Sequence, residues 1–305
     1  MFKKRMLDNH TRRYESLPAW FTILIACGMV VLFFLLGQLV GGATFGLLLM
    51  PVVFLKPEMA STLLGSIYFQ LGLFSFVALS QFAWVKWYEK RSITSLGFFK
   101  QGWFLEILKG WGVGMGIFTF AFALTYLFGG VRLQSVDFSW STVIYVLSII
   151  PFWFVQGGTE ELLTRGWLLP IINKRSNLAV AIGISSSLFG FMHLSNSHVT
   201  VFSIMGIILS GVFMALYMLK TDNLWGVAGL HGAWNFTQGN IFGVAVSGTG
   251  AGKSLFHFVN KAGAADWVSG GRFGTEGSLL TSLVLLVASI ILALLLYKEK
   301  EVVKD

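Results

Sequence analysis

The chain has 305 residues, of which 55% are hydrophobic and only 12% charged, and its mean hydropathy is +0.73. This composition excludes an ordinary soluble domain and indicates an integral membrane protein that crosses the bilayer several times. The net charge of +8 does not indicate a nucleic-acid partner, because basic residues in a membrane protein mark its topology.

The apolar runs predict eight transmembrane helices, each long enough to cross about 30 Å of hydrocarbon. In chain order they cover residues 19–41, 61–85, 107–128, 141–173, 178–195, 200–219, 224–244 and 278–297. The first run contains the only cysteine, Cys27, so neither a disulfide framework nor a thiolate metal site can form. Because lipid offers no hydrogen bonds to the backbone, the predicted fold class is an all-α transmembrane bundle.

The predicted topology is one transmembrane domain, residues 19–297, between a basic N-terminal segment, residues 1–18, and a tail, residues 298–305. With eight spans, sixteen Lys and Arg residues fall on the side of the two termini and five on the other side. This positive-inside bias predicts that both termini are cytoplasmic. The basic N-terminus and the lack of an organelle signal favour a bacterial cytoplasmic membrane, whose lipids surround the chain.

The longest predicted loop, about residues 245–277, contains the stretch SGTGAGKS, which looks like a phosphate-binding loop. Ser247 stands where such a loop needs its first glycine, and no strand is predicted before it. We therefore expect no nucleotide partner and interpret the segment as an external loop.

The fourth span is overlong and carries two acids and a base in the stretch GGTEELLTRGW. An ionisable residue deep in a span costs roughly 3 kcal/mol on insertion scales, so such residues suggest a functional site. Glu161 and Arg165 are four residues apart on one helix face and are expected to pair. Glu160 is rotated by about 100° from Glu161 and lacks that partner, so we assign it to chemistry. The preceding Gly157–Gly158 predicts a kink or break in the helix.

Two further spans carry polar side chains at helical spacing. The fifth ends in FGFMH, with Phe189 and His193 four residues apart, and the seventh contains HGAWN, with His231 and Asn235 four residues apart. If the chain turns at residues 174–177, Glu160 and His193 lie about 20 Å and 24 Å from the turn, at nearly one depth. Alone, His193 would more often be a hydrogen-bonded interface residue, and the pair His231 and Asn235 would fit interhelical hydrogen bonding and a functional site equally well. Their shared depth favours a common site.

One carboxylate, two imidazoles and one carboxamide can form a hydrolytic site. Glu and His side chains can activate a water molecule, while His and Asn side chains can donate to the oxyanion of a tetrahedral intermediate. Glu160, His193 and His231 could instead coordinate a divalent metal such as zinc, although the sequence has no HExxH spacing. The cofactor is therefore left open by the residues alone.

The three motifs resemble those of a known family. EELLTR is similar to EExxxR, FGFMH to FxxxH and HGAWN to HxxxN, which are signatures of the CPBP intramembrane proteases. That family comprises type II CAAX prenyl endopeptidases and bacterial bacteriocin-processing or self-immunity relatives. The motifs occur in the family order within a core of residues 141–244. Residues 270–279, GGRFGTEGSL, are also similar to the segment that often precedes the last helix in bacterial members.

The resemblance implies an intramembrane endopeptidase with eight helices. The residues matching Glu160 and His193 would activate water, and those matching His231 and Asn235 would stabilise the oxyanion. The remaining motif positions would support them: Glu161, Arg165 and Phe189. Both metal-dependent and metal-free, glutamate-based mechanisms have been advanced for the family, and the poor zinc affinity of Asn favours the second. The expected substrate is a peptide or membrane protein rather than a prenylated protein.

Two other functions remain as alternatives. A non-catalytic membrane scaffold or immunity protein of the same fold would keep the bundle without needing Glu160. A proton or divalent-cation transporter would use Glu160, His193 and His231 as a relay. The sequence has no recognisable inverted repeat and no matching pair of broken helices, which argues against transport.

Overall fold

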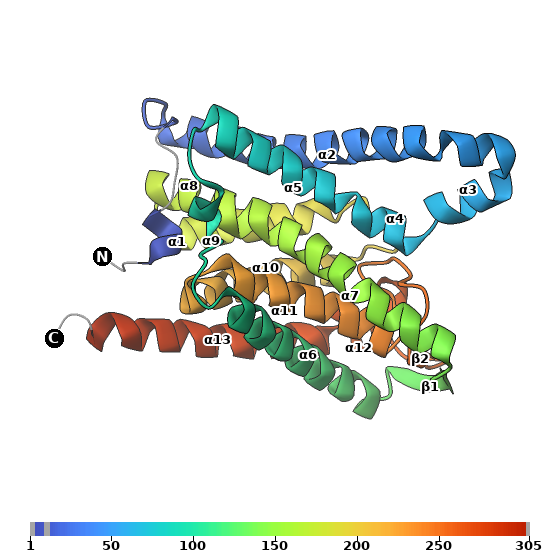
Figure 1. The fold of residues 1–305 in the computed structure, drawn as a ribbon. Coiled ribbons are helices and arrows are strands. Elements are labelled where there is room, and N and C mark those ends of the chain that lie inside the picture. Colours follow the sequence, from blue (N-terminus) through green and yellow to red (C-terminus); the bar gives the residue numbers. More distant parts are fainter. Residues whose placement is uncertain (1–3, 9–12, 303–305) are drawn as a thin grey trace.

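The predicted transmembrane runs are helices that lie side by side in one bundle (Figure 1). The computed structural model describes residues 4–8 and 13–302, so the predicted N-terminal segment and C-terminal tail lie partly outside the described residues. The α-helices are α1 (Arg5–Asp8), α2 (Ala19–Leu55), α3 (Pro57–Leu64), α4 (Ile67–Gly72), α5 (Phe74–Ala83), α6 (Trp103–Leu127), α7 (Trp140–Glu161), α8 (Leu169–Arg175), α9 (Leu178–Met192), α10 (Val201–Thr221), α11 (Leu224–Phe236), α12 (Asp266–Ser269) and α13 (Leu279–Val302).

Shorter elements extend or connect these helices. The π-helical segments are Trp84–Tyr88, Leu162–Leu168 and Thr237–Ile241, and the 3-10 turns are Ile93–Leu96, Gly271–Phe273 and Thr275–Gly277. Two strands, β1 (Val131–Val136) and β2 (Phe256–Asn260), pair antiparallel with Val131 opposite Asn260. This ribbon ties the predicted external loop to the end of α6, at the end of the bundle opposite both termini (Figure 1).

Six helical runs in the described chain are long and apolar enough to cross a membrane. They are Ala19–Leu55, Ile67–Tyr88, Trp103–Leu127, Trp140–Arg175, Val201–Thr221 and Leu279–Glu299. The all-α, multi-pass membrane fold is thereby confirmed, but the predicted count of eight spans is not. The other two predicted spans are helices of the bundle: α9 has only 15 residues, and α11 is buried at every position except Trp225.

The first span is longer than the sequence analysis predicted. Helix α2 has 37 residues, about 55 Å at 1.5 Å per residue, and ends at Leu55 rather than near residue 41. The prediction stopped where one bilayer thickness had been crossed, although the chain beyond it stays apolar. Leu47 and Phe54 in this extension are 70% and 75% exposed, whereas Phe45 packs against Phe69 of α4 and Phe76 of α5.

The fourth span contains no helix break before its acidic pair, so that prediction is wrong. Helix α7 runs without interruption through Gly157–Gly158 to Glu161, and the irregular hydrogen bonding begins after it, in the π-helical Leu162–Leu168. The glycines serve packing instead. A Cβ on Gly157 would lie 2.8 Å from the Gly232 backbone nitrogen of α11, and a Cβ on Gly232 would lie 2.9 Å from the Phe154 Cα of α7. Helices α7 and α11 thus approach each other closely at Gly157 and Gly232.

This close approach makes Gly157→Ala destabilising. We expect it to lower the free energy of unfolding by about 1–3 kcal/mol, because the backbone of α11 cannot yield to the added methyl group. Gly158→Ala is the matched control on the same helix, since its Cβ would meet only the Ala228 Cβ at 3.4 Å. That change should be neutral or stabilising, because Ala favours a helix over Gly. Unfolding in detergent mixtures measures both, and equal effects would contradict the packing role.

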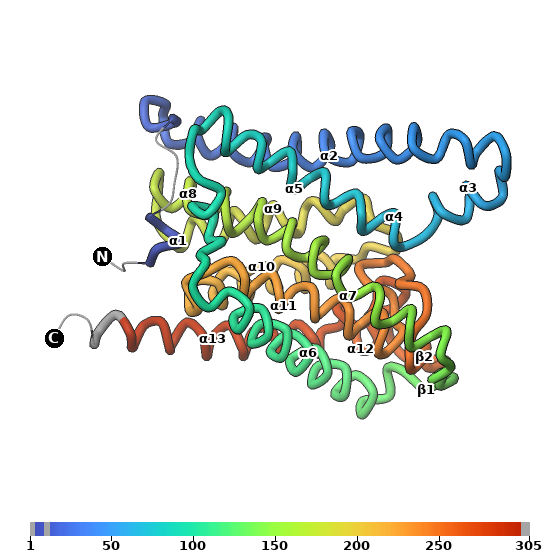
Figure 2. Tube along the Cα trace, in the orientation of Figure 1, coloured from blue at the N-terminus to red at the C-terminus, as the bar shows by residue number. Residues whose placement is uncertain are grey.

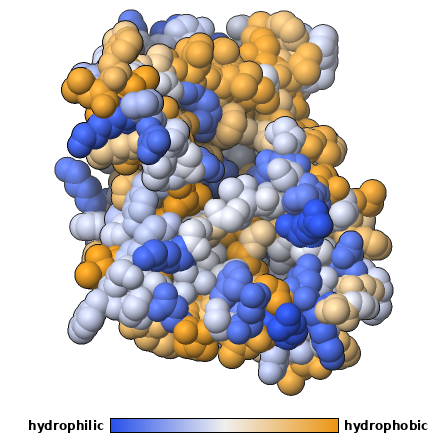
Figure 3. Space-filling model, turned by 90° about the vertical axis from the view of Figure 1, so that its right-hand side faces the viewer, coloured by the Kyte–Doolittle hydropathy of each residue, from blue (hydrophilic) through white to orange (hydrophobic). Residues whose placement is uncertain are grey.

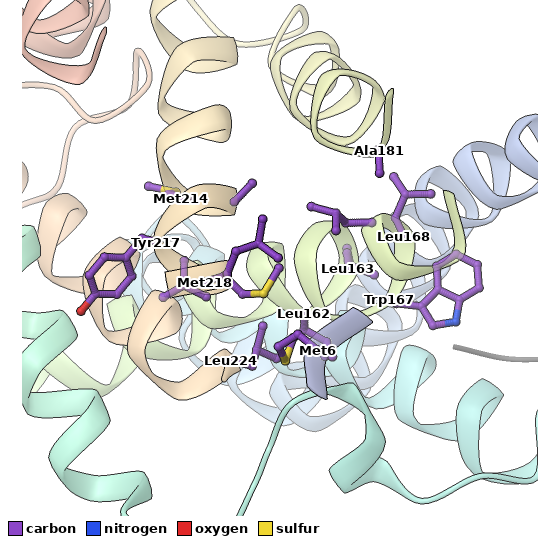
Figure 4. Close-up of a cluster of buried hydrophobic side chains, with 14 of the residues drawn as sticks. Met6, Leu162, Leu163, Trp167, Leu168, Ala181, Met214, Tyr217, Met218 and Leu224 are labelled. Atoms are coloured by element: carbon purple, nitrogen blue, oxygen red, sulfur yellow. The ribbon is translucent and has the colours of Figure 1, made fainter. Parts of the chain in front are cut away.

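The main apolar core extends from the end of the bundle that holds both termini to α6 and β1 near the opposite end. Figure 4 shows part of it, where π-helical Leu162–Leu168 packs against α10, α11 and the N-terminal segment. Its residues are almost completely removed from the surface, and they include Met6, Leu162, Leu163, Trp167, Leu168, Met214, Met218 and Leu224. Burial of such side chains stabilises by roughly 1.5–3 kcal/mol each relative to exposure in water.

Candidate active site

A cavity of about 210 Å³ lies inside the bundle and contains all four predicted catalytic residues. Glu160 comes from α7, His193 directly follows α9, and His231 and Asn235 come from α11. Further walls are formed by α2, α4, α5 and α10 and by two segments near the end of the chain, residues 246–249 and Glu276. The depth argument therefore gave a correct proximity for Glu160 and His193, which are 33 positions apart in the sequence.

Glu161 and Arg165 form the expected ion pair, with Nη1 of Arg165 3.1 Å from Oε1 of Glu161. Both side chains are fully buried, and Arg165 also donates to Thr164 Oγ1 at 2.6 Å and to the Gly211 carbonyl oxygen at 2.8 Å. The same Glu161 oxygen accepts a hydrogen bond from His231 Nδ1 at 2.9 Å. The ion pair therefore also holds His231 in place. This contact joins two helices, so residue spacing along one helix could not predict it.

Glu160 occupies a different environment from its neighbour. Its side chain is 13% exposed and lines the cavity, whereas that of Glu161 is fully buried. Oε2 of Glu160 lies 3.4 Å from Nε2 of His231 but has no hydrogen bond within the described part of the chain. The imidazole of His231 thus stands between the two carboxylates, with Nδ1 bonded to Glu161 and Nε2 facing Glu160.

His193 is oriented by its own helix. Its Nδ1 donates to the carbonyl oxygen of Phe189 at 2.8 Å, because that oxygen can only accept. The Phe189 ring packs edge-on against His193 at 4.8 Å and His231 at 5.8 Å between centroids. The Arg165 guanidinium lies 4.8 Å from the centroid of the same ring. Phe189 therefore joins the three motifs in one packed unit.

Asn235 is held by a residue that the sequence analysis missed. Its Nδ2 donates to Oε1 of Gln156 at 2.8 Å, and both side chains are more than 90% buried. Gln156 lies one turn before Glu160 on the same face of α7 and also lines the cavity. The sequence offered one signal for Gln156, its spacing of four residues from Glu160. A single Gln in an apolar helix forms no motif by itself.

The comparison with protein families agrees with this geometry. Residues 141–237 match the family model described as Type II CAAX prenyl endopeptidase Rce1-like. The resemblance to the CPBP family is confirmed. The Rce1-like segment covers α7 to α11 and contains all three motifs, but it leaves out the first three spans and everything after residue 237. Neither the curated proteins nor the solved structures gave a match to the chain.

Part of the cavity wall lies beyond the Rce1-like segment. The backbone N–H and the hydroxyl of Ser247 both donate to Oε1 of Glu276, the hydroxyl at 2.9 Å, and Asn196 donates to the Ser247 carbonyl oxygen at 3.0 Å. Burial raises the pKa of Glu276, while the Ser247 hydrogen bonds and the nearby His193 oppose that rise. The predicted external loop therefore folds back against the bundle (Figure 2). Its residues 246–249 and Glu276 line the cavity. Only the likeness of residues 270–279 to family members pointed to this region.

The side chains do not form a metal site in this arrangement. Within the described ranges, no three His, Cys, Asp or Glu side chains are grouped closely enough to hold an ion. The set Glu160, His193 and His231 therefore does not fit a metal as it stands, and we derive no step through one.

Proposed function

We propose that the chain is an intramembrane endopeptidase that hydrolyses peptide bonds in peptide or membrane-protein substrates. The observation that carries this proposal is the meeting of Glu160, His193, His231 and Asn235 in one cavity of an apolar bundle. The Rce1-like segment supports it, because that family model describes an endopeptidase. Buried polar groups are costly in a membrane, so four of them around a cavity favour chemistry over packing.

Glu160 is the proposed general base. Its uncommitted Oε2 can accept a proton from a water molecule that His193 Nε2 helps to orient. The water oxygen then forms a bond to the carbonyl carbon, and Glu160 holds the proton. When the carbon–nitrogen bond breaks, that proton passes to the leaving amine. The products are a carboxylic acid and an amine, which separate as carboxylate and ammonium, so no further reactant is needed.

His231 and Asn235 are the proposed oxyanion donors. A protonated His231 brings the charges of the cluster to zero, because it and Arg165 balance Glu160 and Glu161. Its Nε2–H can then donate toward the developing oxyanion. One Asn235 N–H is taken by Gln156, which leaves the second hydrogen of the amide for the same oxygen.

Gln156 is a positioning residue in this scheme, because it holds Asn235 in place. Its removal should change kcat but not KM. We expect Gln156→Leu to lower kcat roughly tenfold to a hundredfold at nearly constant KM, since a misplaced oxyanion donor loses transition-state stabilisation. Gln156→Glu retains the acceptor and should recover most of the activity. Steady-state kinetics with a cleavable peptide measures both. A rise in KM without a change in kcat would assign Gln156 to substrate binding instead.

The direct test is mass spectrometry of peptides incubated with the purified chain in liposomes. The set should include unmodified peptides, transmembrane peptides and prenylated peptides with a carboxyl-terminal CAAX sequence, each with and without a strong chelator. Defined internal cleavage products support an endopeptidase and identify the substrate class. Loss of products on chelation would overturn the metal-free scheme. Intact peptides in every arm, from a folded protein, would favour the non-catalytic scaffold.

A further inference from the structure

The cavity extends toward the end of the bundle that is opposite the two termini. Asn196, Ser247 and Glu276 lie in the segments at that end, and all three line the cavity. Gln70 on α4 and Thr249 line it too and are exposed at the surface. Figure 3 views this end and shows a hollow between apolar residues at the top and more polar residues below.

The end that holds the termini is closed. Leu163 and Met214 line the cavity and are only 1% and 2% exposed, and both belong to the apolar core shown in Figure 4. Behind them, Trp167 is completely buried, and Met6 of the N-terminal segment is 1% exposed. The backbone N–H of Met6 donates to Asp222 Oδ1 at 3.0 Å, which holds α1 against the bundle. A peptide approaching from this end would have to displace a packed core.

The distribution of basic residues indicates which end of the bundle faces the cytoplasm. The closed end carries basic residues after α5, at the end of α8 and at the end of α10, among them Lys90, Arg91, Lys100, Lys174, Arg175 and Lys220. The open end carries only Lys56, Arg132, Lys253, Lys261 and Arg272 among the described residues. The side with more Lys and Arg in its short loops is the cytoplasmic side.

We infer that the cavity opens to the extracytoplasmic side and receives polypeptide substrates exposed at that surface of the membrane. The carboxyl-terminal tail of a cytoplasmic protein would meet the closed end. The cleavage itself rests on the proposed function, but the direction of access rests only on the packing and the charges. Much of the open rim comes from α4 and from residues 246–249 and Glu276, outside the Rce1-like segment. Substrate selection is therefore assigned to those parts of the chain.

Cysteine accessibility in intact cells tests the direction of access without requiring activity. Replacing Cys27 by Ser removes the only thiol, and single cysteines are then introduced at three sites. Thr249→Cys places a thiol at the open rim, and Lys100→Cys places one at an exposed position of the closed end. Ser210→Cys places one on the cavity wall, about 14 Å along α10 from its first residue. The probe is a small, charged, membrane-impermeant methanethiosulfonate.

We expect Thr249→Cys and Ser210→Cys to react fully in intact cells, and Lys100→Cys to react only after the cells are permeabilised. Reaction of Lys100→Cys from outside, with Thr249→Cys protected, would invert the topology and overturn the inference. Reaction of Ser210→Cys only after permeabilisation would show that the cavity opens to the cytoplasm, which also overturns it. Protection of Ser210→Cys under both conditions would show a closed cavity. None of these outcomes depends on whether the chain cleaves peptides.

Discussion

Glu160→Gln is expected to abolish cleavage in the liposome assay, lowering kcat by roughly a thousandfold or more. The amide has nearly the same shape as the carboxylate but cannot take a proton from water. Oε2 of Glu160 has no hydrogen bond in the described structure, so the replacement breaks none there. The variant should therefore match the wild type in yield, size-exclusion profile and unfolding in detergent.

The matched control is Glu58→Gln, which makes the same chemical change at an exposed position of α3. It should leave both activity and stability unchanged, so that a loss of total charge cannot explain the effect at Glu160. Cleavage by Glu160→Gln at the wild-type rate would remove Glu160 from the chemistry. The scaffold alternative would then account for the site better than the endopeptidase does.

The parts of the site that the sequence predicted are those set by helical spacing. Glu161 and Arg165 pair because residues four apart share a face, and His193 lies over Phe189 for the same reason. The depth of Glu160 relative to His193 followed from the rise per residue and one turn of the chain. These rules act within a helix or between two consecutive helices, and there they gave the right proximities.

Contacts between distant helices were beyond such rules. The bond between Glu161 and His231 spans 70 positions and that between Gln156 and Asn235 spans 79, and neither pair shows a periodic signal. Glu276 was missed as a wall residue because a loop rich in Gly has no pattern that indicates where it folds back. The prediction for Gly157 failed because a single sequence does not distinguish two roles of glycine. One role is to break a helix, and the other is to let a neighbouring helix pack closely.

Arg165 has the largest expected effect on stability. Arg165→Met removes the guanidinium bonded to Glu161 and leaves a fully buried carboxylate with His231 as its one hydrogen-bond partner in the described chain. Breaking a buried pair in this way typically costs about 3–5 kcal/mol, a large fraction of the stability of a folded domain. We expect little folded protein in detergent, because the Gly211 carbonyl and Thr164 hydroxyl also lose their donor.

Glu161→Gln combined with Arg165→Met decides why the single change is harmful. If the unpaired charge dominates, the double variant should recover much of the lost stability, since no ion is left without its counter-ion. A Gln at this position can still accept from His231 Nδ1, so partial activity should return with the fold. Lys109→Met breaks an exposed ion pair with Glu106 and should have little effect, because such pairs are screened by solvent. If the double variant is no more stable than Arg165→Met, the packing of the guanidinium against Phe189 and Gly211 carries the stability instead of the charge.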